Sequence, residues 1–371
     1  MHCGSAVNPT FQIGRHVSHR DRRVIFWPRS KFKERIAGRR KRAGTGLRGW
    51  LLFNSNVSED VPEGHEILRF LESSRRRGIQ LDVLKPRDFE LIVSTEREWR
   101  AEYAGGKLPR PDFIIPRTGS ETTYFTLAVL RQFERMGVAM INGADAVEAC
   151  ADKLQTLQLI SASGLPIPRT ILAKFPVDVD VIEKELGFPV VVKTLRSTRG
   201  AGVVLCQDRE QFDNLASLLG DSNLSADFIF QKYIRASHGR DVRLLVIGGK
   251  VAAAMERRSR NGGFKSNISL GGVGASITPP PEMADLAVKA AEALRLDIAG
   301  VDLLYDERGY RICEANSSPG FVGLESACHI SVPDKVFDFV STRLSPPAPP
   351  PKQSIWGKLV SRVTRREKEK V

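Results

Sequence analysis

The amino-acid sequence predicts an α/β protein in which a small open sheet is followed by antiparallel hairpins. Three observations support this prediction. Between Gly49 and residue 142, short apolar runs alternate with helical patterns, which is typical of an open α/β domain. Further on, segments 241–258 and 299–316 each have the pattern of a β-hairpin. The 42% hydrophobic and 27% charged content is ordinary for a globular chain of 371 residues.

The expected elements can be assigned by residue range. In the first part of the chain, strands are expected at 49–54, 79–84, 111–117 and 138–142, and helices at 64–77 and 124–136. This part contains no GxGxxG motif, so it gives no reason to expect a dinucleotide. A helix at 146–163 and strands at 188–194, 202–205 and 227–234 follow, before the two hairpins. Helices are also expected at 281–295 and in a closing segment that runs to about residue 344.

Positive charge is concentrated at the two ends of the chain. Of the formal charge of +13, residues 1–48 carry +11 and residues 352–371 carry +5, which leaves the body at −3. Residues 1–48 are expected to be a disordered basic extension, because they lack enough apolar surface to offset the entropy cost of ordering. Residues 344–371 form a Pro-rich linker and a basic tail. Such tails can bind RNA or another polyanion, although an extension that only adds solubility, or a spurious one, fits equally well.

Composition also indicates in which cellular compartment the protein is expected. No apolar run reaches the ~20 residues that a membrane helix needs, so no transmembrane segment is expected. The N-terminus lacks the apolar core of a secretory signal. The five cysteines form no CxxC pair and no metal-ligand spacing, and we expect them to be reduced thiols of a cytoplasmic protein.

The hairpin at 299–316 brings two carboxylates together. With a three-residue loop at 307–309, Asp302 faces Glu314, and their Cβ atoms lie roughly 5 Å apart on one face. Two such carboxylates repel each other unless a cation lies between them. Asn316 adds an amide oxygen on the same face, and this all-oxygen set suits Mg²⁺ or Mn²⁺ completed by water and nucleotide phosphates. Alternatively, Glu314 pairs with an arginine and Asn316 begins a turn.

Several cationic residues could bind the phosphates of that nucleotide. Lys193 lies on an apolar strand, where a buried ammonium needs an anion. The glycines after it, including Gly200 and Gly202, would let backbone N–H groups approach phosphate oxygens. Lys153 could reach a second phosphate, and the cations of segment 256–267 suit a triphosphate and a carboxylate substrate. Taken singly, these features are also typical of a snorkelling lysine, a surface lysine and a solvated charge run.

The order and spacing of these motifs resemble the ATP-grasp ligases, and closely the RimK-type α-L-glutamate ligases. The matching stretches include DKLQTLQLISASGLPIP, FPVVVK, RDVRLLVIGGKVAAAMERRS, FKSN, AGVDLL and CEANSSPGFVGLE, within about residues 49–340. The resemblance implies a small open α/β pre-ATP-grasp domain at 49–145. A two-subdomain α+β ATP-grasp fold would follow at 146–343, with subdomains of about 146–230 and 231–343 and basic tails at both ends of the chain.

The resemblance also implies a role for individual residues. It assigns ATP binding to Lys153, Lys193, Gly200, Gly202, Lys232, Tyr233, Ile234, Asp241, Lys265, Ser266 and Asn267. It assigns two Mg²⁺ or Mn²⁺ ions to Asp302, Glu314 and Asn316. Arg257 and Arg258 match an arginine pair that holds a substrate carboxylate or acyl phosphate, and with Lys265 they are the expected catalytic residues. Lys232 departs from the family pattern, where Glu is familiar, which puts the identity of the acceptor in doubt.

The implied activity is that of an ATP-dependent carboxylate–amine ligase. A substrate carboxylate would be activated as an acyl phosphate and then attacked by the amine of an amino acid. The resemblance implies that glutamate is added to the C-terminus of a protein or peptide; a ribosomal acceptor and a homo-oligomer are compatible with it. Two alternatives stay open: a ligase for another amino acid or small-molecule acid, and an RNA- or ribosome-binding protein whose ATP-grasp body senses nucleotide.

Overall fold

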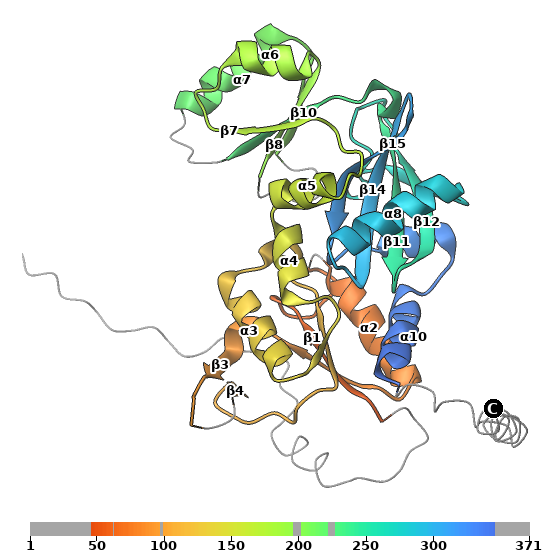
Figure 1. Cartoon of the computed structure of the whole chain (residues 1–371). Helices are drawn as coiled ribbons and strands as arrows, with labels where there is room; N and C mark the ends of the chain where they lie inside the picture. Colours follow the sequence, from red (N-terminus) through yellow and green to blue (C-terminus); the bar gives the residue numbers. More distant parts are fainter. Residues whose placement is uncertain (1–45, 62, 97–98, 196–201, 222–226, 346–371) are drawn as a thin grey trace, which may run out of the picture. The chain divides into compact units, whose positions relative to one another are not determined.

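The computed structural model describes residues 46–61, 63–96, 99–195, 202–221 and 227–345 (Figure 1). The described chain forms one parallel sheet, two antiparallel sheets and a two-stranded ribbon. This arrangement confirms the predicted α/β and α+β fold class. Most of both predicted basic tails, and Gly200, lie outside the described residues, so the expected contact with RNA stays a prediction.

The first sheet is parallel and has helices on both faces. Its strand order is β2 (Gln80–Leu84), β1 (Arg48–Leu52), β5 (Phe113–Pro116) and β6 (Ala139–Met140). Alternate residues of β1 enter different cores: Leu51 packs with Phe70 of α2 (Gly64–Arg76), and Trp50 packs edge-on against Phe133 of α3 (Tyr124–Arg135). A ribbon of β3 (Phe89–Ile92) and β4 (Arg100–Tyr103) was not predicted.

The second sheet is antiparallel and has its own core. Its strand order is β7 (Thr170–Ala173), β10 (Phe228–Lys232), β8 (Val190–Thr194) and β9 (Val203–Cys206). Helices α6 (Val179–Leu186) and α7 (Arg209–Asp221) lie together on one side of it (Figure 1). Phe212 and Phe230 pack between the helices and the sheet.

The third sheet is antiparallel, with the order β13 (Val273–Ser276), β12 (Lys250–Arg258), β11 (Arg240–Ile247), β14 (Ile298–Asp306) and β15 (Gly309–Asn316). One face packs on α8 (Pro281–Ala293) through residues such as Val242 and Leu244. On the opposite face, Asp241 and Arg243 are followed by the apolar Leu245, which packs against α10 (Val332–Leu344). This face therefore has a charged half and an apolar half.

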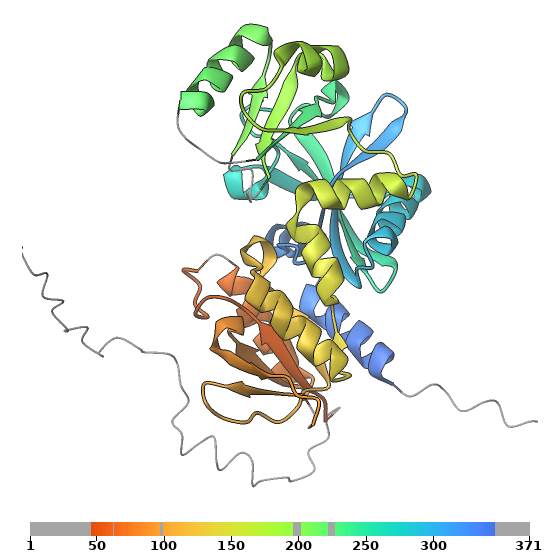
Figure 2. The ribbon, with the colours of Figure 1, turned by 60° about the vertical axis from the view of Figure 1, so that its left-hand side comes forward.

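The helix predicted at 146–163 is wrong in one respect, because it is two helices. These are α4 (Ala144–Ala151) and α5 (Lys153–Ala162), which meet at an angle (Figure 2). Asp152 lies between them with an extended backbone (φ −110°, ψ 113°), and its carboxylate caps α5 by accepting hydrogen bonds from the Leu154 and Gln155 amides. The break places Lys153 at the first turn of α5. The closing helix is likewise divided, into α9 (Val322–Cys328) and α10.

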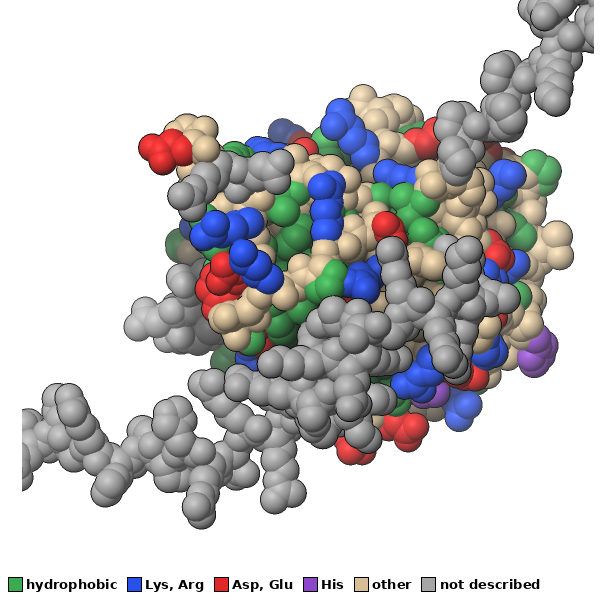
Figure 3. All heavy atoms as spheres, turned by 90° about the horizontal axis from the view of Figure 1, so that it is seen from below, with side chains coloured by type: hydrophobic (Ala, Val, Ile, Leu, Met, Phe, Trp, Pro, Cys, Tyr) green, Lys and Arg blue, Asp and Glu red, His purple; other side chains and the backbone are tan. Residues whose placement is uncertain are grey.

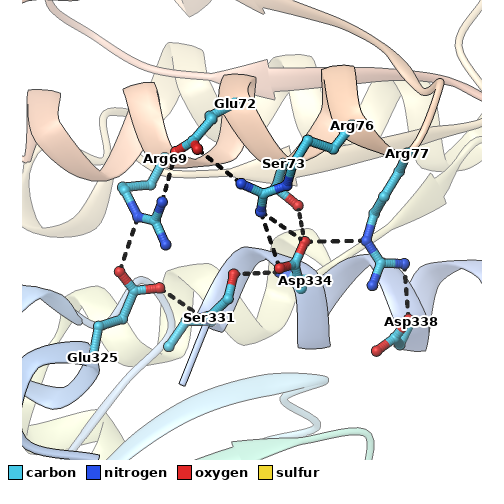
Figure 4. Close-up of polar contacts among 10 residues, drawn as sticks. Arg69, Glu72, Ser73, Arg76, Arg77, Glu325, Ser331, Asp334 and Asp338 are labelled. Atoms are coloured by element: carbon cyan, nitrogen blue, oxygen red, sulfur yellow. Dashed lines mark hydrogen bonds and ion pairs between the residues drawn. The ribbon is translucent and has the colours of Figure 1, made fainter. Parts of the chain in front are cut away.

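A polar network joins α2 to α9 and α10 (Figure 4). Asp334 at the start of α10 accepts hydrogen bonds from Ser73 and from the guanidinium groups of Arg76 (3.1 Å) and Arg77 (3.2 Å). Arg69 binds Glu325 of α9 (3.1 Å). Burial raises the pKa of Asp334, but the hydrogen bonds from the serines and arginines outweigh it and hold that pKa well below its usual range.

Asp334→Asn is expected to lower Tm by a few degrees at pH 7, because it removes the negative charge that both arginines bind. A pKa depressed in the folded state means that the carboxylate stabilises the fold above pH ~4 and that this stabilisation is lost as the pH falls further. Thermal unfolding of both proteins at pH 7 and pH 3 checks this. Equal Tm values at pH 7 would contradict it.

The surface charges, helices and cysteines of the described residues can be compared with the composition. On the face in Figure 3, Lys and Arg side chains are interspersed with Asp and Glu, as the small net charge of the body indicates. No helix within the described ranges has the length and apolar character needed to cross a membrane. The four described cysteines, at positions 150, 206, 313 and 328, are free thiols.

Candidate active site

The charged half of the third sheet faces a cleft of about 510 Å³. The second sheet contributes Lys193 and the end of β10 to its walls. The first domain, which is built on the first sheet and includes α2, contributes Glu66. Most of the predicted site residues line this cleft: Lys153, Lys193, Lys232, Tyr233, Ile234, Asp241, Arg257, Lys265, Ser266, Asn267, Asp302, Glu314 and Asn316. Residues that are far apart in the sequence thus meet in one place.

The β14–β15 hairpin positions the two predicted carboxylates. The three-residue loop is wrong, because Asp306 pairs with Gly309 and leaves a two-residue turn. A β-bulge then shifts the register by one between Asp302 and Leu303, so that Asp302 faces Glu314 as predicted. The bulge also brings two successive residues, Cys313 and Glu314, to the cleft.

Asp302 is bound by Arg243 of the neighbouring strand β11 and by Arg257 of β12, one strand further on. Its Oδ1 accepts from Arg243 Nε (2.7 Å), and its Oδ2 accepts from Arg243 Nη2 (2.7 Å) and Arg257 Nη2 (2.9 Å). Burial raises the pKa of Asp302, but these guanidinium groups outweigh it and lower that pKa to about 2. We considered above that an arginine pairs with Glu314; in the structure it is Asp302 that pairs with arginines.

The remaining oxygens still fit a divalent cation. An ionised carboxylate has about four acceptor positions, and three hydrogen bonds to Asp302 leave one. Within the described chain, no hydrogen bond or ion pair engages the side chain of Glu314. The buried Asn316 Nδ2 has no partner there; as a donor it fits an acceptor such as a phosphate oxygen, while the Oδ1 of the same amide can bind a cation. No group of three His, Cys, Asp or Glu side chains in the described ranges is placed to hold a metal. A metal here thus needs the amide of Asn316 besides the two acids.

Two lysines approach the same part of the cleft from other elements. Lys193 Nζ lies 3.7 Å from Cys313 Sγ, and Lys153 Nζ donates to the Leu195 carbonyl (3.3 Å). Burial lowers the pKa of Lys153, and the charge of Glu314 opposes this effect. Gly202 has φ +65°, and a Cβ there would lie 2.5 Å from Thr194 Oγ1. The backbone can pass this close to β8 only because residue 202 is glycine.

The segments predicted to contact the base and the phosphates line the cleft. Tyr233 is hydrogen-bonded to His238 Nδ1, and His238 Nε2 contacts the Gly262 carbonyl (3.0 Å). These bonds tie the segment after β10 to the loop that leads to the 265–267 triplet. The Lys265 ammonium lies 5.6 Å from the Phe264 ring centroid.

The two neighbouring arginines point to different places. Arg257 is buried, and its Nη2 donates to Asp241 (2.5 Å), the residue opposite it on β11. Arg258 is exposed, pairs with Glu256, and does not line the cleft. Successive residues of a strand point to opposite faces, so the structure does not bring both predicted catalytic arginines to the cleft.

Sequence reasoning missed several residues of the cleft. Arg243 was missed although it lies two residues after Asp241, which puts both on one face of β11. Glu66 was missed although it shares a helix face with Phe70, four residues later. Glu63, His65 and Cys313 also line the cleft. For Cys313 no sequence signal was available, because its place depends on the bulge.

The fold of the described chain is the ATP-grasp fold. Solved structures share the fold: the ATP-grasp ligase PsnB complexed with a precursor variant, Mg and ADP has a TM-score of 0.62 at 21% identity, covering 80% of this chain and 98% of that one. D-alanine–D-alanine ligase from Bacillus anthracis complexed with ATP has a TM-score of 0.58 at 15% identity, covering 80% and 97%.

Residues 150–340 match the RimK-like ATP-grasp domain, and residues 60–147 match the RimK PreATP-grasp domain. A probable alpha-L-glutamate ligase of Citrobacter koseri is 36% identical over 75% of this chain and 92% of its own length. Probable alpha-L-glutamate ligase 1 of Shewanella amazonensis is 39% identical over 76% and 94%. The chain belongs to the RimK-like ATP-grasp family.

Proposed function

We propose that this ligase adds L-glutamate to the C-terminal carboxylate of a protein or peptide at the expense of ATP. The observation that carries the proposal is the charged face of the third sheet. There Glu314 and Asn316 lie beside the Arg243–Asp302–Arg257 cluster, within reach of the lysines of the second sheet and α5. A site with that balance of charges suits a triphosphate bound with a divalent cation.

ATP would lie across the cleft between the second and third sheets. The segment 232–234 would contact the base through its backbone, and Asp241 would contact the nucleotide. Lys153 and Lys193, with Gly202, would bind the phosphates as predicted, and the 265–267 triplet would close the site at the γ-phosphate. Two ions, Mg²⁺ or Mn²⁺, would be held by Asp302, Glu314 and Asn316.

The chemistry needs no side-chain nucleophile. Bound metal would neutralise charge that develops on the transferred phosphoryl group. The acceptor carboxylate attacks the γ-phosphorus, which forms an acyl phosphate and releases ADP. The amine of the amino acid then attacks the acyl carbon, and inorganic phosphate leaves. Arg257 and Lys265 would hold the acyl phosphate in place, since positioning and fixed positive charge supply most of the catalysis here. Arg258, exposed and paired with Glu256, is a weaker candidate for this role.

The names of the relatives support glutamate, and a bound precursor peptide in a PsnB structure supports a peptide acceptor. The test measures ADP release by the full chain with Mg²⁺, ATP, an acceptor peptide library and single amino acids. Glutamate is expected to give the largest rate, with products heavier by one or more glutamate residues in mass spectrometry.

The same assay separates the proposal from its alternative. Preference for another amino acid, or for a small acid in place of the peptides, would contradict glutamate addition to a polypeptide and leave the ATP-grasp chemistry intact. Omitting Mg²⁺ is the control, because ADP release that does not depend on the metal cannot arise from the proposed site.

A further inference from the structure

The loop of residues 317–321 follows directly after Asn316 and is held from behind by the first domain. Three buried polar side chains of that domain bind its main chain at alternate residues. The contacts are Asn142 Nδ2 to the Ser317 carbonyl (2.7 Å), Arg117 Nη1 to the Pro319 carbonyl (3.0 Å), and the Phe321 amide to Glu66 Oε1 (2.7 Å).

The intervening residues face the other way. Ser318 and Gly320 line the cleft together with Asn316. The buried Ser318 Oγ and Asn316 Nδ2 have no hydrogen-bond partner within the described chain. Buried polar atoms are nearly always paired. These two belong to residues that line the cleft, unlike Arg117 Nε, which is also unpaired in the described chain. They are therefore available to a ligand, the amide nitrogen as a donor and the hydroxyl as a donor or acceptor. The loop is thus fully bonded on one side and open on the side of the cleft.

The three side chains are themselves fixed. Glu66 and Arg117 form an ion pair of 2.5 Å in which both side chains are 5% exposed. The Arg117 guanidinium lies 5.9 Å from the ring centroid of Phe70 and 5.5 Å from that of Phe321. Asn142 is fully buried and also binds both main-chain polar groups of Ile298 at the start of β14.

The loop cannot shift toward the third sheet either. A Cβ on Gly300 of β14 would lie 2.5 Å from Pro319 Cβ, so the proline packs directly on the strand. Gly300 is also the residue paired with Asn316. The loop is therefore confined between β14 and the polar side chains of the first domain.

A buried ion pair is seldom needed for stability, because well-packed apolar side chains of similar size often stabilise a protein as much or more. What Glu66 and Arg117 supply, and apolar residues would not, is the direction of two main-chain hydrogen bonds. We propose that Glu66, Arg117 and Asn142 are positioning residues of the ligase, which fix the 317–321 loop so that the Asn316 amide and the Ser318 hydroxyl are presented to the metal–phosphate group. This inference rests on the proposed function.

The test is the double variant Glu66→Leu/Arg117→Met, which removes the pair without leaving a buried charge. ADP binding to the full chain is measured by calorimetry with Mg²⁺ and with a chelator. Outer residues that orient metal ligands typically contribute 10–100-fold to metal affinity. We expect the gain in ADP affinity on adding Mg²⁺ to fall by ~10–100-fold, while ADP affinity in chelator stays as in the unmodified protein.

Asp334→Asn is the matched control, since it weakens the contact between α2 and α10 without touching the loop. Its gain in ADP affinity on adding Mg²⁺ should equal that of the unmodified protein. If the double variant does not fold, Arg117→Lys replaces it, because a lysine keeps the charge beside Glu66 but cannot reproduce the two-pronged guanidinium contact. A folded variant whose ADP affinity rises on adding Mg²⁺ as much as that of the unmodified protein overturns the inference. An unmodified protein without any gain from Mg²⁺ overturns the proposed function instead.

Discussion

Glu314→Gln is expected to lower kcat by on the order of 10³-fold, while Tm stays unchanged. The amide keeps the shape of the side chain but loses the negative charge that a divalent cation requires. A metal contributes several kcal/mol of charge stabilisation in phosphoryl transfer, and each 1.4 kcal/mol corresponds to a tenfold change in rate. Stability should not change, because no hydrogen bond or ion pair engages the side chain of Glu314 in the described chain.

The measurement is steady-state ADP release at saturating Mg²⁺ and ATP, together with thermal unfolding of the metal-free protein. Glu307→Gln is the matched control, because it makes the same chemical change in the exposed turn of the same hairpin. It should keep full activity. A Glu314→Gln enzyme within tenfold of the unmodified rate would remove Glu314 from the metal site.

Asp302→Asn is expected to have a different effect, a loss of both activity and stability. Asp302 is 5% exposed and compensates the buried guanidinium group of Arg257 and the partly buried one of Arg243. Removing one partner of a buried ion pair typically costs about 3–5 kcal/mol, because it leaves a charge uncompensated. We expect the free energy of unfolding to fall by about 3 kcal/mol, the lower end of this range, because Arg257 keeps its bonds to Asp241 and Arg243 is partly exposed. We also expect kcat to be reduced at least as much as in Glu314→Gln.

Urea unfolding of both variants and the unmodified protein at pH 7 measures this difference. The pKa of Asp302 is lowered to about 2 in the folded protein, so its contribution is complete above pH ~4 and is lost as the pH falls toward 2. The difference in the free energy of unfolding between Asp302→Asn and the unmodified protein should accordingly be constant from pH 5 to 7 and become smaller in acid. An Asp302→Asn protein as stable as Glu314→Gln would contradict the structural role of the Arg243–Asp302–Arg257 cluster.

The parts that could be predicted from the sequence are those with a local physical cause. Apolar periodicity located both hairpins and the main helices of the first domain, and alternation placed Asp302 opposite Glu314. That pairing was predicted with a three-residue loop, whereas the structure has a two-residue turn and a bulge that restores the register. The cap by Asp152 is a local signal too, because its carboxylate accepts hydrogen bonds from the first amides of α5.

Other features depend on contacts between distant residues. Glu66 and Phe321 are separated by 255 positions, and no periodicity indicates that a helix of the first domain binds the loop after Asn316. The bidentate contact of Arg243 with Asp302 depends on which strands become neighbours in the third sheet. Strand order follows from packing of the whole chain, so these contacts could be seen only in three dimensions.

Anomalous diffraction from crystals grown with Mn²⁺ and ADP tests most directly whether the charged face of the third sheet is the metal–nucleotide site. We expect a manganese peak bonded to oxygens of Glu314 and Asn316 and to the remaining acceptor position of Asp302, with the ADP phosphates between it and Lys193. A manganese peak elsewhere, or ADP bound with no metal near residues 302, 314 and 316, would contradict this assignment.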